Sequence, residues 1–446
     1  MMTIVPAVLA SVLVLAPPQD PAEARSATNA IVIEVPDRPV GLSAPDRAAL
    51  EPYLVAHPQD ARHLLAGVFL VREYGDPRNS DPVADMVCTA LTSFDGGASW
   101  LRHDFPDPSC LDPWVAVLPN GTALFVGLGQ GGLLVYRSVD GGRTWRDESV
   151  NLGPGHDHGT IAVDATGGAR HGHAYVAAHL SMRDEAGIPR AAVMVARTSD
   201  GGATFGAPTR VVSSNLPAYA NNPVVLSDGA LVVPFVTYAR GTVNAGSIDQ
   251  AWTILSMDGG ATFSVPRFLS DCPGHWGQLA VDMTSGPYRD RLYWVCWDRD
   301  YRNVRLYHSS DRGERWSPPL IINPGTGPAQ TAAIAVNQDG VVGVSWYDGR
   351  EDPRGYRRDF RCQHVYFTAS LDGGRTFLPD VQISSAENCS DTPANGEAGR
   401  RWKAGGEYHG LAAAADGRFH LLWTDSREGI YQLRTASLRV NGITVR

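Results

Sequence analysis

The chain has 446 residues, of which 43% are hydrophobic and 19% charged, with a formal net charge of −9. This composition excludes an intrinsically disordered chain, and the acidic balance offers neither a basic patch for nucleic acid nor an electrostatic attraction to anionic membranes. The 47 glycines and 31 prolines indicate many turns, so the number of domains has to come from internal pattern rather than from length.

The first segment resembles an export leader. An apolar run extends from Ile4 to Ala16, and the small-x-small sequence Ala22-Glu23-Ala24 follows it. This pattern predicts a signal peptide over residues 1–24 and one mature domain over residues 25–446. A membrane anchor is the alternative, but so short an apolar run does not span a bilayer. We therefore expect export to the extracellular space or the periplasm.

One phrase recurs along the chain. Its six copies are SFDGGASW at Ser93, SVDGGRTW at Ser138, TSDGGATF at Thr198, SMDGGATF at Ser256, SSDRGERW at Ser309 and SLDGGRTF at Ser370. Recurrence every 45 to 61 residues is the signature of a repeat architecture. The aspartate can bind backbone amides ahead of it, the glycines accept positive φ, and the closing aromatic residue packs in a core. The phrase is therefore predicted to be a structural turn and not a catalytic element.

This phrase resembles the Asp-box, or bacterial neuraminidase repeat, S-x-D-x-G-x-[TS]-[WF]. The resemblance implies a β-propeller of the sialidase-like superfamily, with each box on the hairpin between the third and fourth strands of a blade. Innermost strands are expected to begin near Tyr53, Trp114, His158, Asn222, Trp276, Thr331 and His409. Seven strand starts predict seven four-stranded blades, and six blades are the alternative.

The last repeat lacks a fourth strand. Its third strand is IYQLRTASL, after which the chain soon ends at Arg446. The early segment AIVIEV, Ala30 to Val35, has the alternating pattern of a strand and could close the ring. Between the last two blades, the polar stretch from Ser384 to Gly406 is expected to form an elaborated loop.

The six cysteines fall into three couples of near neighbours. They are Cys88 with Cys110, Cys272 with Cys296, and Cys362 with Cys389. An even number in an exported chain favours disulfides over free buried thiols. No C-x-x-C occurs, and no ligand spacing encodes a metal, although a structural Ca²⁺ among the acidic loops would be compatible with the sequence. We predict no cofactor.

Loops of a propeller alternate between two faces, so the Asp-box hairpins share one face and the loops that enter each new blade share the other. The entry loops read SCLDPW, GPGHDHG, AYANNP, CPGHWG, TGPAQT and GGEYHG. Their ends bring polar and aromatic side chains to the central channel, which is the default position for a site. The converging residues are Trp114, Asp157, His158, Tyr219, Asn222, His275, Trp276, Tyr408 and His409.

The segment EYHGLAAAADGRFHLLWTD resembles the tyrosine segment of sialidases, which places Tyr408 at the position of that family's nucleophile. In that family a glutamate assists the tyrosine, an aspartate is the acid/base, and three arginines hold the substrate carboxylate. In a hydrolase of this type, Tyr408 is expected to be the nucleophile or a general acid/base, and Asp157 is expected to donate or accept the proton. The resemblance leaves Asn222 or a neighbour where the family carries its glutamate.

Two arginines could orient an acidic sugar. Arg350 lies in WYDGRED and Arg427 in WTDSRE, and WDRDYR repeats the same type of phrase. Aspartate and arginine two residues apart at a strand end form either an internal ion pair or, for the arginine, a bidentate clamp on a substrate carboxylate.

Three functions fit these residues. The first is a secreted, sialidase-like glycoside hydrolase that uses Tyr408 and Asp157, with His275 and Asn222 contacting the glycan. The second is a polysaccharide lyase in which His158 or His409 removes a proton and Tyr408 protonates the leaving oxygen. The third is a non-catalytic propeller that stacks sugars on Trp114 and Trp276. In each case we expect a monomer whose partner is a glycan or polysaccharide.

Overall fold

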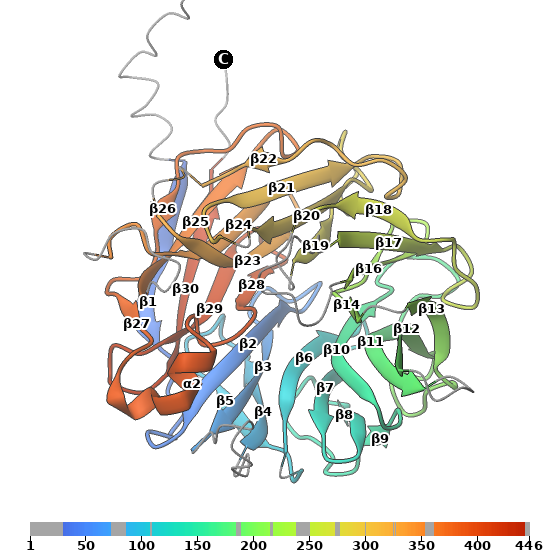
Figure 1. Ribbon diagram of the computed structural model, residues 1–446, viewed down its shortest axis with the longest axis horizontal. Coiled ribbons are helices and arrows are strands. Elements are labelled where there is room, and N and C mark those ends of the chain that lie inside the picture. The colour runs from blue at the N-terminus through green and yellow to red at the C-terminus, as the bar shows by residue number, and fades with distance from the viewer. Residues whose placement is uncertain are drawn as a thin grey trace, which may run out of the picture.

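The computed structural model describes residues 30–441, except for 73–85, 108, 184–188, 215–216, 238–249, 273–276, 299, 324, 326 and 353–360. Within these residues, seven antiparallel sheets surround a common centre (Figure 1). Five sheets have four strands, and two carry one additional short strand. The prediction of an all-β, seven-bladed propeller is confirmed, and the six-bladed alternative is wrong. The predicted signal peptide lies outside the described residues.

The first three blades follow each other without an intervening element. Blade one comprises β2 (Ala48–Ala56), β3 (Leu64–Val71), β4 (Met86–Ser93) and β5 (Leu101–Asp104). Blade two comprises β6 (Leu111–Val117), β7 (Ala123–Gly129), β8 (Gly132–Ser138) and β9 (Val150–Asn151). Blade three comprises β10 (His156–Val163), β11 (Ala174–Arg183), β12 (Pro189–Thr198) and β13 (Thr209–Ser214).

The remaining blades repeat the same order from centre to rim. Blade four comprises β14 (Ala218–Ala220), β15 (Val224–Val225), β16 (Leu231–Thr237), β17 (Gln250–Ser256) and β18 (Arg267–Ser270). Blade five comprises β19 (Gln278–Val281), β20 (Leu292–Trp297), β21 (Val304–Ser309) and β22 (Leu320–Ile321). Blade six comprises β23 (Ala329–Val336), β24 (Val342–Asp348), β25 (Cys362–Ser370), β26 (Val381–Gln382) and β27 (Asn388–Cys389). Blade seven comprises β28 (Gly410–Ala413), β29 (Phe419–Asp425) and β30 (Gln432–Val440).

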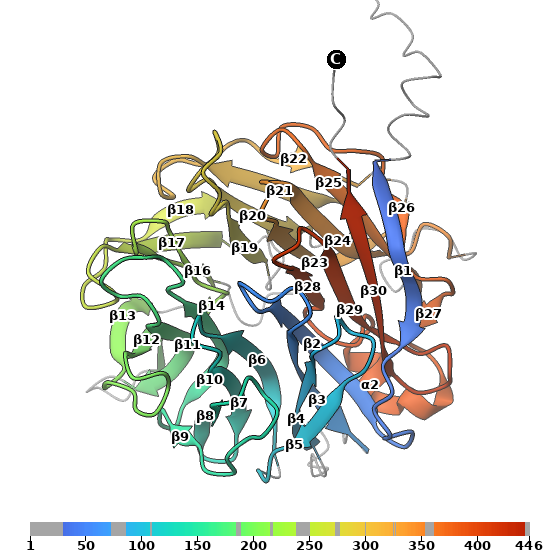
Figure 2. The same ribbon diagram turned by 180° about the vertical axis from the view of Figure 1, so that it is seen from behind.

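The N-terminal strand β1 (Ile31–Pro39) supplies the missing fourth strand of blade seven. It pairs antiparallel with β30, from Ile31 opposite Val440 to Pro39 opposite Arg434, and the two strands lie side by side in Figure 2. The Asp37 carboxylate binds the guanidinium groups of Arg427 and Arg434. The sequence prediction that the N-terminus closes the ring is confirmed.

The core lies between neighbouring blades. The indole rings of Trp294, Trp346 and Trp423 come from the second strands of blades five, six and seven, and all three are fully buried. The Trp346 Nε1–H donates to Asp348 Oδ2 at 2.9 Å, and the Trp423 Nε1–H donates to Asp425 at 3.3 Å. These hydrogen bonds explain why tryptophan and aspartate recur two residues apart at the ends of β24 and β29.

All six Asp boxes lie between the third and fourth strands of blades one to six. In blade three, Asp200 Oδ1 accepts hydrogen bonds from the Thr198 hydroxyl and the Thr204 amide, and Asp200 Oδ2 accepts one from the Thr204 hydroxyl at 2.6 Å. These donors hold the pKa of Asp200 at about 2, although partial burial works in the opposite direction. The aspartate is therefore occupied within its own turn.

The three predicted cysteine couples are disulfides: Cys88–Cys110, Cys272–Cys296 and Cys362–Cys389. Cys88–Cys110 and Cys362–Cys389 join the third strand of a blade to the segment that leads into the next blade, and Cys272–Cys296 joins the loop that enters blade five to the second strand of that same blade. The elaborated loop after blade six contains a 3₁₀ turn, η2 (Pro393–Asn395), and a short helix, α2 (Gly396–Arg401). Across the described residues, no helix combines the length and the apolar character needed to cross a membrane.

Candidate functional site

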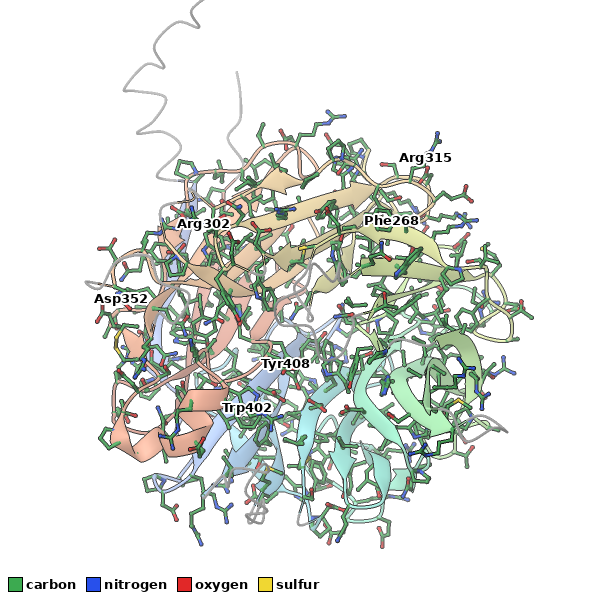
Figure 3. The ribbon with its side chains drawn as sticks, viewed as in Figure 1. Phe268, Arg302, Arg315, Asp352, Trp402 and Tyr408 are labelled. Carbon is green, nitrogen blue, oxygen red and sulfur yellow. A yellow bond between two sulfur atoms is a disulfide. The ribbon has the colours of Figure 1, made fainter. Side chains whose placement is uncertain are left out.

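A cavity of about 570 Å³ opens beside the central channel. Its described lining comes from the starts of first strands, the ends of second strands and the loop that enters blade seven: Glu51, Leu111, Asp112, Leu128, Gly155, His156, Asp157, Ser181, Tyr219, Arg401, Trp402 and Glu407. The cavity therefore lies on the face opposite the Asp-box hairpins. Figure 3 shows Trp402 and Tyr408 near the middle of the ring and Arg315, from an Asp box, at its outer edge.

A repeated backbone irregularity positions side chains at the mouth of the channel. In four blades the innermost strand carries a residue with positive φ next to a register shift: Glu51 (φ 54°), Asp112 (φ 51°), His158 (φ 50°) and Thr331 (φ 52°). Left-handed backbone is unfavourable for residues with a Cβ, and such positions cluster at functional sites. Two of the four, Glu51 and Asp112, line the cavity.

Asp157 lies at the start of β10, and its carboxyl group lines the cavity. The Tyr219 hydroxyl donates a hydrogen bond to its carboxylate, and the carboxyl groups of Asp157 and Asp112 share another. Burial, followed by the charge of Asp112, raises the pKa of Asp157 to about 6. The nearby His158 works in the opposite direction. Asp157 can therefore hold a proton in weakly acidic solution and release it near neutrality.

Tyr219 is itself held firmly. Its ring stacks on the His179 ring with centroids 4.3 Å apart and an interplanar angle of 5°. The His179 Nδ1 lies 2.8 Å from the Ala218 carbonyl oxygen, and its Nε2 lies 2.9 Å from the Ser181 hydroxyl. Because both ring nitrogens are occupied, His179 fixes the Tyr219 ring that contacts Asp157.

Glu51 and Tyr408 form a buried pair. The Tyr408 hydroxyl lies 3.5 Å from Glu51 Oε2 and donates to the Pro113 carbonyl oxygen at 3.3 Å. Burial, together with the charges of Asp112 and Glu407, raises the pKa of Glu51 well above its ordinary value. Burial and the same group of acids, led by Glu51, also raise the pKa of Tyr408. The Tyr408 hydroxyl therefore keeps its proton near pH 7, and the Glu51 carboxyl group holds its proton more tightly than a carboxyl group in water does.

Tyr408 is only 2% exposed and is absent from the cavity lining. Its ring packs with the rings of Tyr53, Trp114 and His158 at centroid distances of 6.3, 5.4 and 5.9 Å. The structure thus brings three predicted residues, Trp114, His158 and Tyr408, together in one buried cluster. Trp114 is 2% exposed, because the Tyr53 ring lies 3.7 Å from it.

Two other predicted residues connect blades. Asn222 donates from Nδ2 to the Leu279 carbonyl oxygen at 2.6 Å and accepts from the Leu279 amide at 2.8 Å. His409 is fully buried, its Nε2 lies 2.6 Å from the Ser345 hydroxyl, and burial lowers its pKa to about 4. Neither residue lines the cavity.

Both predicted arginines form internal ion pairs. Arg350 Nη2 lies 2.7 Å from Asp348 and from Asp380, and Arg427 Nη2 lies 2.7 Å from Asp425. Neither is among the described residues of the cavity lining. The sequence left open whether Arg350 and Arg427 form internal ion pairs or clamp a substrate, and in the structure both form internal ion pairs. The predicted residues His275 and Trp276 lie outside the described residues.

Sequence reasoning missed four charged residues of the lining: Glu51, Asp112, Arg401 and Glu407. A signal was present for the first two, because Glu51-Pro-Tyr and Asp112-Pro-Trp occupy the same position in blades one and two. Arg401 and Glu407 come from the elaborated loop, where no repeat marks them. Among the described lining residues, Arg401 is the single arginine beside four carboxylic acids.

The repeats, the seven blades and the closure by β1 define an Asp-box β-propeller. A family model for the BNR repeat-like domain matches residues 171–421, more than half of the chain. The chain therefore belongs to this family. A comparison with curated proteins finds no match.

Among solved structures, a protein of unknown function from Dyadobacter fermentans DSM 18053 is 12% identical over 92% of this chain and 100% of its own, with a TM-score of 0.53. A Hadza microbial sialidase is 13% identical over 92% of this chain and 93% of its own, with a TM-score of 0.49. An ulvan lyase is 11% identical over 68% and 76% of the two chains, with a TM-score of 0.46. At these identities the similarity concerns the fold alone.

Proposed function

We propose that this protein is a glycoside hydrolase whose active site is the acidic cavity on the blade-entry face. The observation that carries the proposal is the environment of Asp157. Its carboxyl group lines the cavity, and its pKa is raised to about 6 by burial and by Asp112. A general acid is most effective when its pKa lies near the working pH. Asp157 has the properties needed to protonate the oxygen of a scissile glycosidic bond.

A second carboxylate is needed on the other side of the sugar, to activate water or to attack the anomeric carbon. Asp112 is too close for that role, since it shares a hydrogen bond with Asp157. Glu407 lines the same cavity but comes from the loop that enters blade seven, so that blades one and two separate it from Asp157 around the ring. We assign the role of this second carboxylate to Glu407.

Tyr408 receives a positioning role in this proposal. Its hydroxyl contacts Glu51 and Pro113 beneath the cavity, and its raised pKa makes it a weak nucleophile. Its assignment as the nucleophile stays a prediction from the sequence. The buried pair of Tyr408 and Glu51 instead supports the strand start that holds Asp112, whose backbone amide donates to the Glu51 carboxyl group.

The charge of the cavity favours a substrate with no anionic group on the sugar that is cleaved. Four acids line the cavity beside Arg401, whereas a sialate or uronate carboxylate needs concentrated positive charge. A lyase would need an accessible base, but His158 and His409 are both buried, and His409 lies against the Ser345 hydroxyl. A binder that stacks sugars on Trp114 would need an exposed ring, and Tyr53 covers it.

The three disulfides support a location in an oxidising compartment. We propose that residues 1–24 are a signal peptide, that residues 25–446 form one exported domain, and that the protein works as a monomer on an extracellular or periplasmic glycan.

The proposal is tested by incubating the protein with a panel of neutral and acidic polysaccharides and measuring the release of reducing ends. We expect Asp157→Asn to reduce kcat by about 10²- to 10⁴-fold, the usual contribution of a general acid. Activity of the wild type should fall as the pH rises above about 6, where Asp157 loses its proton. Asp200→Asn, in an Asp box, is the control and should retain turnover. Products that absorb in the ultraviolet would indicate elimination and contradict hydrolysis, as would full activity of Asp157→Asn.

A further inference from the structure

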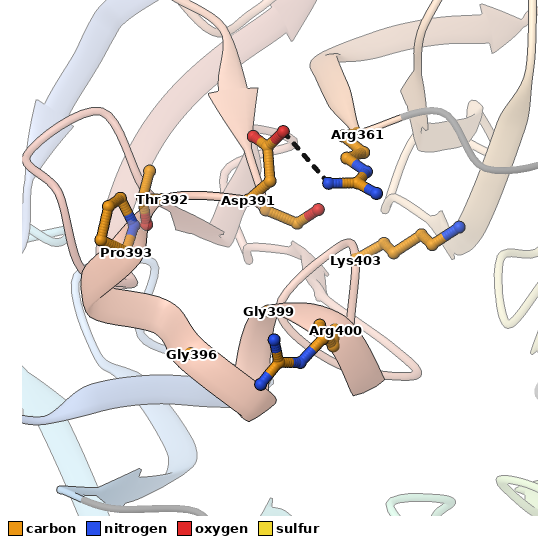
Figure 4. A pocket seen from close by; sticks show the side chains of 9 residues that line it. Arg361, Asp391, Thr392, Pro393, Gly396, Gly399, Arg400 and Lys403 are labelled. Carbon is orange, nitrogen blue, oxygen red and sulfur yellow. Dashed lines mark hydrogen bonds and ion pairs between the residues drawn. The ribbon is translucent and has the colours of Figure 1, made fainter.

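A second cavity, of about 390 Å³, lies on the elaborated loop between blades six and seven. Its lining includes three cationic side chains, Arg361, Arg400 and Lys403, and one acidic side chain, Asp391 (Figure 4). Ser390 and Thr392 also line it. In a chain with a formal net charge of −9, this is a local excess of positive charge.

The two arginines are placed by ion pairs yet stay open to solvent. Arg361 Nη1 lies 3.4 Å from Asp391 Oδ2, and the two side chains are 48% and 41% exposed. Arg400 pairs with Glu397 on the same turn of α2, and the Arg400 side chain is 71% exposed. An ion pair that is exposed to solvent contributes little free energy, so an entering anion can share these guanidinium groups with the two acids.

The same short segment borders both cavities. Arg400 and Lys403 line the cationic cavity, whereas Arg401 and Trp402, between them in sequence, line the acidic cavity of the candidate active site. The Arg401 guanidinium lies over the Trp402 ring, 4.4 Å from its centroid. Residues 400–403 therefore separate a site rich in carboxylates from one rich in cations.

We propose that the cationic cavity binds the carboxylate or sulfate group of an acidic glycan at least one sugar away from the bond that is cleaved. This inference rests on the proposed hydrolase function of the neighbouring cavity. An anionic group placed in the acidic cavity lies beside the Asp112 and Glu407 carboxyl groups, whereas next to Arg361 and Arg400 it meets forked donors that match the two oxygens of a carboxylate or sulfate. The substrate class is an acidic heteropolysaccharide in which neutral and anionic sugars alternate or lie close together.

The test measures binding rather than turnover, so that it stands apart from the test of the hydrolase. Fluorescein-labelled chondroitin sulfate hexasaccharide, an oligogalacturonate and uncharged cellohexaose are titrated with the full-length protein by fluorescence anisotropy. The proteins are the wild type, Arg361→Gln/Arg400→Gln, and the matched control Arg62→Gln/Arg315→Gln. The control removes two equally charged but distant side chains that are 78% and 89% exposed.

We expect saturable binding of at least one acidic oligosaccharide, weaker binding of cellohexaose, and a Kd about tenfold higher in Arg361→Gln/Arg400→Gln, with the control unchanged within about twofold. Equal weakening in both double variants, or no preference for the acidic probes, would overturn the proposal. Competition by sodium sulfate at the affinity of the sulfated probe would identify a site for inorganic anions and overturn the assignment to a glycan. Asp157→Asn should keep this binding, so a failure of the hydrolase proposal is recognised separately.

Discussion

Replacing Asp157 by asparagine should stabilise the folded protein at alkaline pH while lowering the proposed hydrolase activity. The native environment raises the pKa of Asp157 from 3.8 to about 6, because the carboxyl group is largely buried and faces Asp112. Between these two values the folded protein retains a proton that the unfolded chain releases. The free energy of unfolding therefore falls as the pH rises through this window, by about 3 kcal/mol in total.

Asparagine carries no charge and can still accept from Tyr219 and donate to Asp112. We therefore expect Asp157→Asn to be more stable than the wild type by about 1–3 kcal/mol at pH 8, and to show little gain at pH 4, at the lower end of the window. Urea unfolding followed by tryptophan fluorescence at both pH values measures this difference.

The Asp-box variant Asp200→Asn provides a control of opposite sign. The pKa of Asp200 is lowered to about 2, so its contribution to stability is present above pH 3.8 and is lost as the pH falls through about 2. At pH 8 this variant should be less stable than the wild type. A lower stability of Asp157→Asn at pH 8, or the same difference from the wild type at pH 4 and pH 8, would refute the reasoning about the cavity.

Three further outcomes are expected. Tyr408→Phe should unfold about 1 kcal/mol more easily, because it loses the hydroxyl contacts to Glu51 and Pro113, yet it should keep kcat within about tenfold on any glycan that is turned over; a loss of more than a thousandfold would restore the tyrosine as nucleophile. Asp200→Ala should lower the free energy of unfolding by about 1–3 kcal/mol in urea titrations, since three hydrogen bonds disappear, without changing kcat/KM of the folded fraction. Removing the disulfide of Cys362 and Cys389 by double serine substitution should lower the free energy of unfolding by about 2–4 kcal/mol and raise KM, because the bond anchors the loop that supplies Arg401 and Glu407; an unchanged KM would argue against a role for that loop in substrate binding.

The architecture could be predicted because the sequence repeats one short motif six times. Each of the six Asp boxes fixes one hairpin through its own short-range hydrogen bonds, and the seven starts of innermost strands give the number of blades. The closure by β1 followed from the missing last strand and from the alternating pattern of Ala30 to Val35. The same strand count placed the entry loops on the face opposite the boxes, which is where the cavity containing Asp157 lies.

The chemistry of the mouth was harder to predict. Glu51 and Asp112 lie in strands whose backbone turns through positive φ, and this irregularity, invisible in the alternation of apolar residues, brings their carboxyl groups to the cavity. Trp114 was expected to contact substrate, but the packing of Tyr53 against its ring buries it. Arg350 and Arg427 follow aspartates by two residues, and the sequence could not decide between an internal ion pair and a clamp, because that choice depends on Asp380 and Asp37, which come from distant segments.

The location of the functional face can be measured directly by hydrogen–deuterium exchange of the Asp157→Asn variant, with and without an oligosaccharide that the wild type cleaves. The structure predicts slower exchange on binding in residues 154–158, 218–220 and 400–408, and no change in the hairpins at residues 95–99 and 140–144. Protection of the Asp-box hairpins, with the entry loops unaffected, would contradict the placement of the site.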